Sequence, residues 1–378
     1  MTTFEKIKIP KNLVNNFTEI SIKYNNNFFL IYPVFYNEIN KFKNKIENNI
    51  ENIKTWDKMK KITNPYELIY SSYNKYNNIA KYIPLSRSYF KMWEIINEFE
   101  LFKNKQYDSL NIACLAEGPG GFMEAINNYR VPIVDKIYGI TLEPNNEHIP
   151  GWENINLKYN FKITYGNLYN KTDIDKFYKT IDSKVYLITA DGGFDYSIDF
   201  NNQESLSYRI IFCEITCALK MQQHNGHFIC KIFDIFSLFM VKLILFLNTL
   251  YEEVYIYKPK TSRYTNSEKY LICKNFKGIS NNILNNLFEI VDNWNEDKII
   301  IDIPEIQINN EYYNFFYNYN KDYIENQIKY IELTIKYVLY HFTTDEYKNI
   351  LDKQIKNAIE WCKKNKISIN KKCKYFVK

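Results

Sequence analysis

Glycine and proline are both scarce in this chain, with only 10 of each among its 378 residues. Such contents exclude collagen-like chains and low-complexity chains that are rich in these two residues. Hydrophobic residues make up 46% of the sequence, which is enough to bury a core rather than leave the chain disordered. The length allows one large α/β domain with flanking helical segments, or two domains.

Closely spaced cysteines are also missing. The seven cysteines form no Cys-x-x-Cys pair, and their odd number predicts free thiols in a reducing, intracellular compartment, either the cytoplasm or the nucleus. None of the four histidines has cysteines at the spacing of a metal site. We therefore expect no bound metal ion.

No apolar run is long enough to cross a membrane. The longest, Phe236–Leu250, contains Lys242 and falls short of the length that a bilayer requires, so we interpret it as a core helix. The first residues lack the pattern of a secretory signal peptide, and we expect no membrane partner. The net charge of +6 is compatible with a polyanionic partner, but equally with a solvated surface rich in Lys and Asn.

Three of the few glycines stand close together, at Gly118, Gly120 and Gly121. They follow the apolar run Ile112–Ala116 and precede a segment compatible with a helix, Phe122–Tyr129. A strand, a glycine turn and a helix N-terminus bring backbone N–H groups close to a nucleoside-bearing ligand. The turn reads GPGG rather than G-x-G-x-x-G, so a nicotinamide dehydrogenase is disfavoured. A tight turn without any ligand is the alternative.

From Asn111 onward, strand patterns alternate with helical patterns, which is typical of a parallel sheet with crossover helices. After the glycine strand, we expect strands at Lys136–Leu142, Phe161–Tyr165, Val185–Ala190, His227–Lys231, Glu253–Tyr257 and Glu268–Cys273. We expect helices at Ser86–Ile95, with Ser86 as N-cap, and at Asp173–Thr180, Gln203–Gln223 and Phe236–Leu250. Ligands of open α/β sheets bind beyond the carboxyl ends of the strands, so one crevice should be faced by Glu143, Asn167, Asp191 and Lys231.

Charged residues placed directly after buried strands are costly unless they are paired or functional. Asp191 and Lys231 fit this description, and Glu268 opens the seventh expected strand beside them. A buried ion pair with a spare carboxylate is one interpretation, and an active site is the other. Lys91 stands among apolar neighbours of a predicted helix, where spacing alone indicates a surface lysine.

Four stretches of the chain resemble the FtsJ-like family of RNA ribose 2′-O-methyltransferases, most closely its eukaryotic and viral mRNA-cap branch. They are SRSYFKMWEI (86–95), LAEGPGGF (115–122), TADGGFD with FNNQE (189–204), and GHFICKIFD with KPKTSRYTNSEKYLIC (226–273). The resemblance implies a Rossmann-like methyltransferase fold: a seven-stranded, mostly parallel α/β sheet whose last strand is antiparallel, with helical N- and C-terminal extensions.

The resemblance also implies the site. The family's Lys-Asp-Lys-Glu tetrad falls on Lys91, Asp191, Lys231 and Glu268, with a neutral Lys231 as the general base that activates a ribose 2′-hydroxyl. The methyl donor, S-adenosylmethionine, would contact Ser86, Lys91, Glu117, Gly118, Pro119, Gly120, Gly121, Phe122, Asn167, Leu168 and Asp191. The residues implied to hold RNA are Asn201, Asn202, Gln203 and Arg263, and an arginine suits bidentate binding of phosphate.

Two residues depart from the family pattern. Cys114 stands where many relatives carry an acid, and Asn167 stands where an aspartate is common. An amide can still form hydrogen bonds with the adenine or methionine end of the donor. We therefore expect altered affinity for the donor rather than loss of activity.

The resemblance divides the chain into an N-terminal helical extension (1–80), an FtsJ-like methyltransferase domain (81–276) and a mainly helical C-terminal extension (277–378). The periodicity predicts helices around Phe35–Met59, at Asp322–Phe342 and at Asp345–Lys364. The extensions could dock the capping or transcription machinery or bind RNA, although a solvated helical cap is the simpler interpretation.

The implied substrate is the first or second nucleotide of 5′-capped mRNA. A ribosomal or transfer RNA methyltransferase, and a non-catalytic RNA-binding subunit that keeps the fold, stay open as alternatives. Heavy use of Asn, Lys, Ile, Tyr and Phe indicates an A/T-rich genome, such as that of a large DNA virus or a protist. A viral protein would act in a cytoplasmic viral factory or the virion.

Overall fold

The structure is a computed structural model, and it describes residues 6–11, 17–49, 53–144, 151–152, 159, 161–193, 202–340 and 342–376. The strands are β1 (Ile7–Lys8), β2 (Lys23–Asn25), β3 (Asn111–Leu115), β4 (Lys136–Thr141), β5 (Lys162–Tyr165), β6 (Val185–Ala190), β7 (Gln222–Ile232), β8 (Tyr251–Tyr257), β9 (Lys269–Phe276) and β10 (Ile299–Asp302). The helices of the first half are α1 (Pro33–Asn49), α2 (Ile53–Thr63), η1 (Glu67–Ile69), η2 (Lys75–Asn77), α3 (Ser88–Phe99), α4 (Gly121–Arg130) and α6 (Lys171–Lys179). Those of the second half are α7 (Gln203–Leu206), α8 (Tyr208–Met221), α9 (Leu238–Leu250), α10 (Asn281–Asp292), α11 (Asn310–Leu339) and α12 (Thr344–Lys364).

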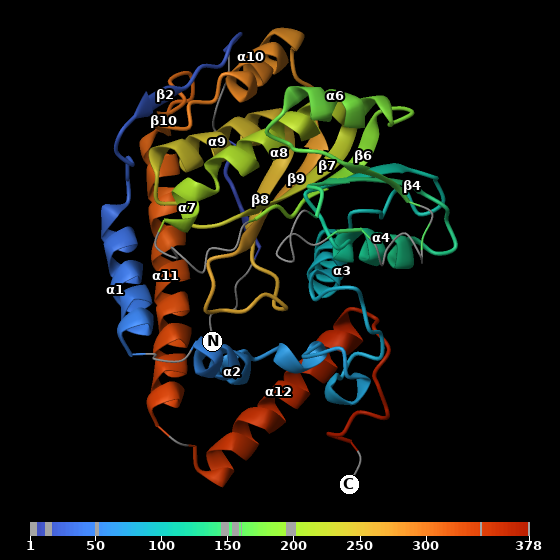
Figure 1. The fold of residues 1–378 in the computed structure, drawn as a ribbon, viewed down its shortest axis with the longest axis vertical. Coiled ribbons are helices and arrows are strands. Elements are labelled where there is room, and N and C mark those ends of the chain that lie inside the picture. The colour runs from blue at the N-terminus through green and yellow to red at the C-terminus, as the bar shows by residue number, and fades with distance from the viewer. Residues whose placement is uncertain are drawn as a thin grey trace.

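An eight-stranded sheet runs through the centre of the molecule in the order β1-β8-β9-β7-β6-β3-β4-β5 (Figure 1). Strands β3 to β7 are parallel, and β9 is antiparallel to both of its neighbours, β7 and β8. Helices α6, α8 and α9 cover one face, and α3 and α4 cover the other (Figure 1). Because both faces are covered, the central strands read as continuous apolar runs, and all six residues of β6 are buried.

The expected fold class is confirmed, including the antiparallel last strand, and β6 has the predicted bounds. The eighth strand, β1, was not expected; it pairs antiparallel with β8, opposite Ile256 and Tyr255. The predicted helix Gln203–Gln223 is two helices, α7 and α8. They separate at Ser207, whose hydroxyl donates to the carbonyl of Glu204 at 2.8 Å and so competes with the helical bonds there.

Several predicted element ends are also wrong. Strand β9 begins at Lys269, so Glu268 lies before it, β8 begins at Tyr251, and α6 begins at Lys171. Strand β7 begins at Gln222 rather than His227, because Gln222 pairs with Val185 of β6 and its side-chain amide donates to the carbonyl oxygens of Val185 and Tyr186. Helix α3 begins at Ser88, and no side chain caps its N-terminus, so Ser86 is not an N-cap.

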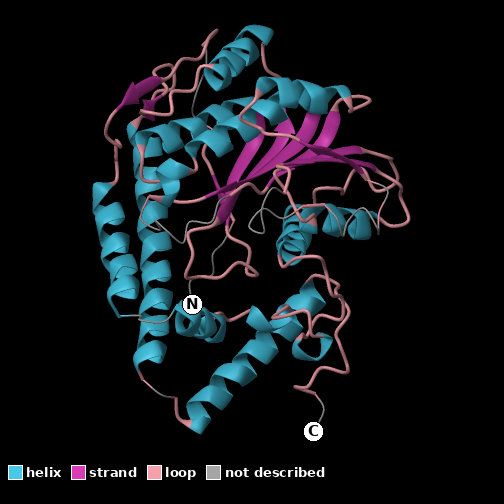
Figure 2. Ribbon diagram, in the orientation of Figure 1, coloured by secondary structure: helices cyan, strands magenta, loops and turns pink. Residues whose placement is uncertain are grey.

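The N- and C-terminal segments pack against each other, as the labelled elements of Figure 1 and the same view in Figure 2 show. Strand β2 pairs with β10, and helix α1 contacts α11. The described part of the first 80 residues therefore contains the short strands β1 and β2 besides the expected helices. Helix α11 begins at Asn310, well before the predicted Asp322, because the Asn309 side chain accepts a hydrogen bond from the backbone N–H of Tyr312 at 2.9 Å. Helix α12 starts with a capping box formed by Thr343 and Glu346 and ends at Lys364 as predicted.

The apolar run at Phe236–Leu250 forms α9, which is buried nearly all round and begins after the Ser237 N-cap. In the described ranges, no helix combines the length and the apolar character needed to cross a membrane. All seven cysteines are buried and unpaired, as their spacing predicts.

Candidate active site

The glycine turn connects β3 to α4. Gly120 has a φ of 105°, a left-handed conformation that favours glycine, and α4 begins at the next residue. A Cβ on Gly121 would lie 2.2 Å from the hydroxyl oxygen of Ser86 and 2.1 Å from that of Ser88. The absence of this Cβ lets the N-termini of α3 and α4 approach each other at the carboxyl end of β3.

Glu117, in the same turn, is buried. Its carboxyl oxygens accept hydrogen bonds from the backbone N–H groups of Phe122 at 2.8 Å and Met123 at 3.5 Å. Burial and the neighbouring charge of Asp191 raise the pKa of Glu117 well above its ordinary value. The carboxyl group therefore accepts hydrogen bonds from the first turn of α4 and lies close enough to Asp191 to interact with its charge.

The first pair of the predicted tetrad joins α3 to the residue that precedes β9. The ammonium nitrogen of Lys91 lies 2.8 Å from both carboxylate oxygens of Glu268, and each side chain is only 14% exposed. The Ser262 hydroxyl donates to the same carboxylate at 2.8 Å. Burial alone would raise the pKa of Glu268, but the charges of Lys91 and Lys231 lower it to about 2. Glu268 is therefore ionised at any ordinary pH.

The second pair joins the ends of β6 and β7. The amine of Lys231 donates to the carbonyl oxygen of Asp191 at 2.6 Å and lies 3.4 Å from its carboxylate. The Tyr270 hydroxyl donates to that carboxylate at 2.9 Å. A Cβ on Gly193 would lie 3.0 Å from the Lys231 nitrogen, so glycine at this position avoids a steric conflict with the lysine side chain.

The structure thus brings together all four residues of the tetrad, including Lys91, which spacing alone indicated as a surface lysine. They come from α3, from the ends of β6 and β7, and from the loop before β9. Two lysines and two carboxylates at the carboxyl ends of central strands form a polar, mostly buried site that can hold and move a proton.

Glu214 of α8 belongs to this site but was missed from the sequence. It is fully buried, and its carboxyl oxygen accepts the backbone N–H of Gly192 at 2.9 Å, directly after Asp191. Burial raises the pKa of Glu214 to about 8, although Lys231 pulls it down. The one signal in the sequence is a carboxyl residue between Cys213 and Ile215, on an apolar helix face.

Two other residues implied for the methyl donor differ in exposure: Leu168 is buried, whereas Asn167 is exposed. Glu143, predicted to face the crevice, is also exposed. The Asn167 side chain accepts the backbone N–H of Tyr169 at 2.9 Å and so shapes its own turn. Cys114 is buried within β3, and burial raises the pKa of its thiol.

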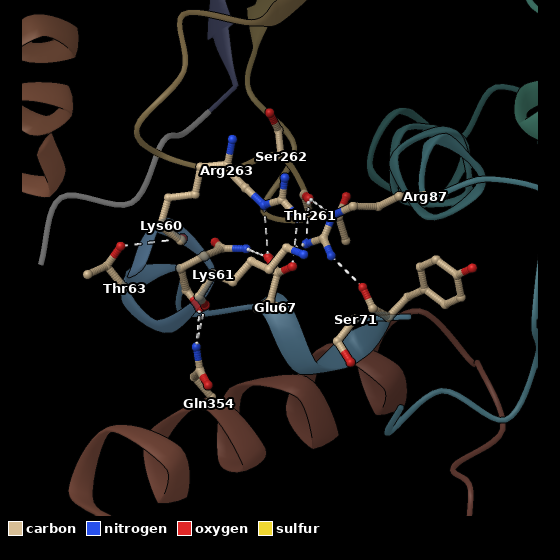
Figure 3. A network of polar contacts seen from close by, with 12 residues as sticks. Lys60, Lys61, Thr63, Glu67, Ser71, Arg87, Thr261, Ser262, Arg263 and Gln354 are labelled. Atoms are coloured by element: carbon tan, nitrogen blue, oxygen red, sulfur yellow. Dashed lines mark hydrogen bonds and ion pairs between the residues drawn. The ribbon is translucent and has the colours of Figure 1, made fainter. Parts of the chain in front are cut away.

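Arg263, implied to hold RNA, is paired with a carboxylate of the N-terminal segment (Figure 3). Its guanidinium donates to the two oxygens of Glu67 at 2.8 and 3.1 Å, and Arg87 approaches the same carboxylate at 3.4 Å. Asn202 accepts a hydrogen bond from the Tyr36 hydroxyl, and Gln203 accepts one from the Ser267 hydroxyl. Asn201 lies outside the described residues.

The sheet and the site define a class of protein. An open, mostly parallel sheet with an antiparallel strand between β7 and β8, a glycine turn after β3 and charged residues at the strand ends is typical of Rossmann-like methyltransferases. The sequence matches the family of FtsJ-like methyltransferases over residues 84–276, more than half of the chain, and the chain belongs to this family. The methyl donor in this family is S-adenosylmethionine.

Several similar proteins bear the name cap-specific mRNA (nucleoside-2′-O-)-methyltransferase 1. Those of Homo sapiens and Mus musculus are each 30% identical over 250 residues, 61% of this chain and 30% of the relative. That of Drosophila melanogaster is 34% identical over 170 residues, 42% of this chain and 21% of the relative. The chain therefore spans less than a third of the length of these curated relatives. A solved ribosomal RNA methyltransferase from Plasmodium falciparum is 21% identical, with a TM-score of 0.38, over 51% of this chain and 99% of that one.

Proposed function

We propose that this chain transfers a methyl group to a ribose 2′-hydroxyl of RNA, at the first or second nucleotide of capped mRNA. The observation that carries the proposal is the assembly of the Lys91–Glu268 and Lys231–Asp191 pairs beside the glycine turn. Similarity to relatives named as cap-specific mRNA methyltransferases supports capped mRNA as the substrate class.

Lys231 is the proposed general base. Its amine must be neutral to accept the proton of the 2′-hydroxyl, and the hydrogen bond to the Asp191 carbonyl holds its nitrogen in place. Lys91 is fixed by Glu268, and these two charges are proposed to orient the hydroxyl in a partly buried setting, where alignment contributes much of the acceleration. When bound, S-adenosylmethionine supplies the electrophilic methyl group.

The residues around the turn fit this donor. Gly118 and Gly120 offer main chain without side chains, and the Ser86 hydroxyl lies beside Gly121. The carboxyl groups of Glu117 and Asp191 offer acceptors for amine and ribose hydroxyl groups. The residues proposed to hold the donor are Ser86, Lys91, Glu117, Gly118, Pro119, Gly120, Gly121, Phe122, Asn167, Leu168 and Asp191.

We further propose that RNA lies along Asn201, Asn202, Gln203 and Arg263. The hydrogen bond from Ser267 to Gln203 supports this path, because Ser267 directly precedes Glu268 of the tetrad. An RNA phosphate would replace Glu67 as the bidentate partner of Arg263, since a guanidinium pairs with either anion. Residues 81–276 are proposed as the catalytic domain, and the extensions as docking sites for capping or transcription machinery in the nucleus or cytoplasm.

Methyl transfer from labelled S-adenosylmethionine to three short RNAs tests the proposal. The RNAs carry an N7-methylguanosine cap, an unmethylated guanosine cap or no cap, and Lys231→Ala is measured alongside. We expect incorporation only on capped RNA, on a ribose, and its loss in the variant. Equal transfer to uncapped RNA would refute the proposal that capped mRNA is the substrate. The absence of transfer to any of the three RNAs would refute the proposal that the chain is a methyltransferase.

A further inference from the structure

The loop between β8 and β9, residues 258–268, carries Glu268 at its end and Ser262, which donates to Glu268. A loop that supplies a catalytic carboxylate must be held accurately, because a displacement of about 1 Å can cost on the order of 100-fold in rate. The groups that hold this loop are therefore part of how the site works.

Glu94 of α3 holds the start of this loop, together with Arg87, whose guanidinium donates to the carbonyl oxygen of Thr261 at 3.1 and 3.2 Å. It lies one helical turn beyond Lys91 and is only 4% exposed. One carboxylate oxygen accepts the Tyr257 hydroxyl and the backbone N–H of Lys260, both at 2.8 Å. The other accepts the backbone N–H of Thr261 at 3.2 Å and its hydroxyl at 3.1 Å.

The fifth hydrogen bond to Glu94 comes from the C-terminal extension. The indole N–H of Trp361, in α12, donates to the second oxygen at 2.9 Å. These five donors satisfy both oxygens of the buried Glu94 side chain. The extension therefore contributes to a contact one turn away from a tetrad residue.

The two ends of the loop are also joined to each other. The buried amine of Lys258 donates to the carbonyl oxygen of Glu268 at 2.7 Å and to that of Asn266 at 2.8 Å. A shift of the loop start is thus transmitted to Glu268. Helix α3 holds both ends, through Glu94 at the start and Lys91 at the end.

We propose that Glu94 is a positioning residue for the reaction: by binding the loop start to α3, it sets where Glu268 stands relative to Lys91. This role rests on the proposed function. The hydrogen bonds of Glu94 go to the loop start and to Trp361. Its loss should therefore lower kcat and leave in place donor binding, which depends on the glycine turn.

The test is Glu94→Gln. The substitution replaces one carboxylate oxygen with an NH₂ group, which cannot accept hydrogen bonds from the donors that now contact that oxygen. We expect kcat for methyl transfer to fall about 10- to 100-fold, with an unchanged Kd for S-adenosylmethionine by calorimetry. The matched control is Glu98→Gln, one turn further along α3, whose carboxylate binds Lys364 of α12 at 2.8 Å but does not contact the loop. The control should keep wild-type kcat.

A second variant, Thr261→Val, removes only one hydroxyl donor and is expected to fold if Glu94→Gln does not; its kcat should fall several-fold. Wild-type kcat in a folded Glu94→Gln protein, or in Thr261→Val where the first variant does not fold, would overturn the proposal. So would a parallel loss of donor affinity, which indicates general structural damage. If the unmodified chain transfers no methyl group, the proposed function fails first, and the role of Glu94 with it.

Discussion

Replacing Glu214 with glutamine should remove a large part of the pH dependence of this protein's stability between pH 5 and pH 9. Glu214 is fully buried under the end of β6 and accepts the backbone N–H of Gly192. Glutamine keeps an oxygen for that hydrogen bond and has nearly the same shape, but it never ionises. The variant therefore imitates the protonated carboxyl group at every pH.

The magnitude follows from the pKa. Burial raises the pKa of Glu214 from 4.5 to about 8. Between these two pH values the native carboxyl group keeps a proton that the unfolded chain releases, so its contribution to stability is complete below pH 4.5 and is lost as pH rises through 8. At about 1.4 kcal/mol per pKa unit, the loss at pH 9 is on the order of 5 kcal/mol.

Urea unfolding of both proteins at pH 5, 7 and 9 measures this difference. The free energies of unfolding should agree within about 1 kcal/mol at pH 5, and the variant should be the more stable protein by several kcal/mol at pH 9. Glu204, whose pKa burial raises to about 7, changes stability in the same direction, but it is present in both proteins and cancels. A difference between the two proteins that stays constant from pH 5 to pH 9 would refute the reasoning.

Three further variants test other parts of the site. Lys231→Ala should lower methyl transfer by at least about 100-fold while calorimetry finds donor binding unchanged; a smaller loss would exclude this amine as the base. Gly121→Ala places a Cβ 2.1 Å from the Ser88 hydroxyl oxygen, so donor affinity should fall about tenfold and recover in part when Ser88→Ala is added. Glu67→Gln leaves Arg263 without its carboxylate, and urea unfolding should report a loss of about 3–5 kcal/mol; a loss below about 0.5 kcal/mol would mean that the pair is no more than a solvated contact.

Strand β6 and Asp191, the residue that follows it, could be predicted from the sequence, because both depend on local pattern. Val185–Ala190 is a continuous apolar run, which is typical of a strand covered on both faces, and the structure gives it the same bounds. Asp191 then follows from a simple argument about charge at a buried strand end.

Lys91 and Glu94 could not be understood in this way. On an amphipathic helix the spacing says which face is apolar, but not what covers a charged residue. Lys91 is paired with a carboxylate 177 positions later in the chain, and Glu94 accepts hydrogen bonds both from a loop 166 positions away and from Trp361. Only resemblance to a family pointed to Lys91, and no pattern pointed to Glu94.

Strand β1 has a consequence for the solubility of shortened forms of this protein. Ile7 and Lys8 pair with β8, whose free side would otherwise present unpaired N–H and C=O groups at the edge of the sheet. Such edges recruit strands from other molecules and start aggregation. A fragment limited to 81–276 keeps the four tetrad residues but uncovers β8, and we expect it to self-associate. Strand β1 thus protects the edge of the sheet from other copies of the same chain.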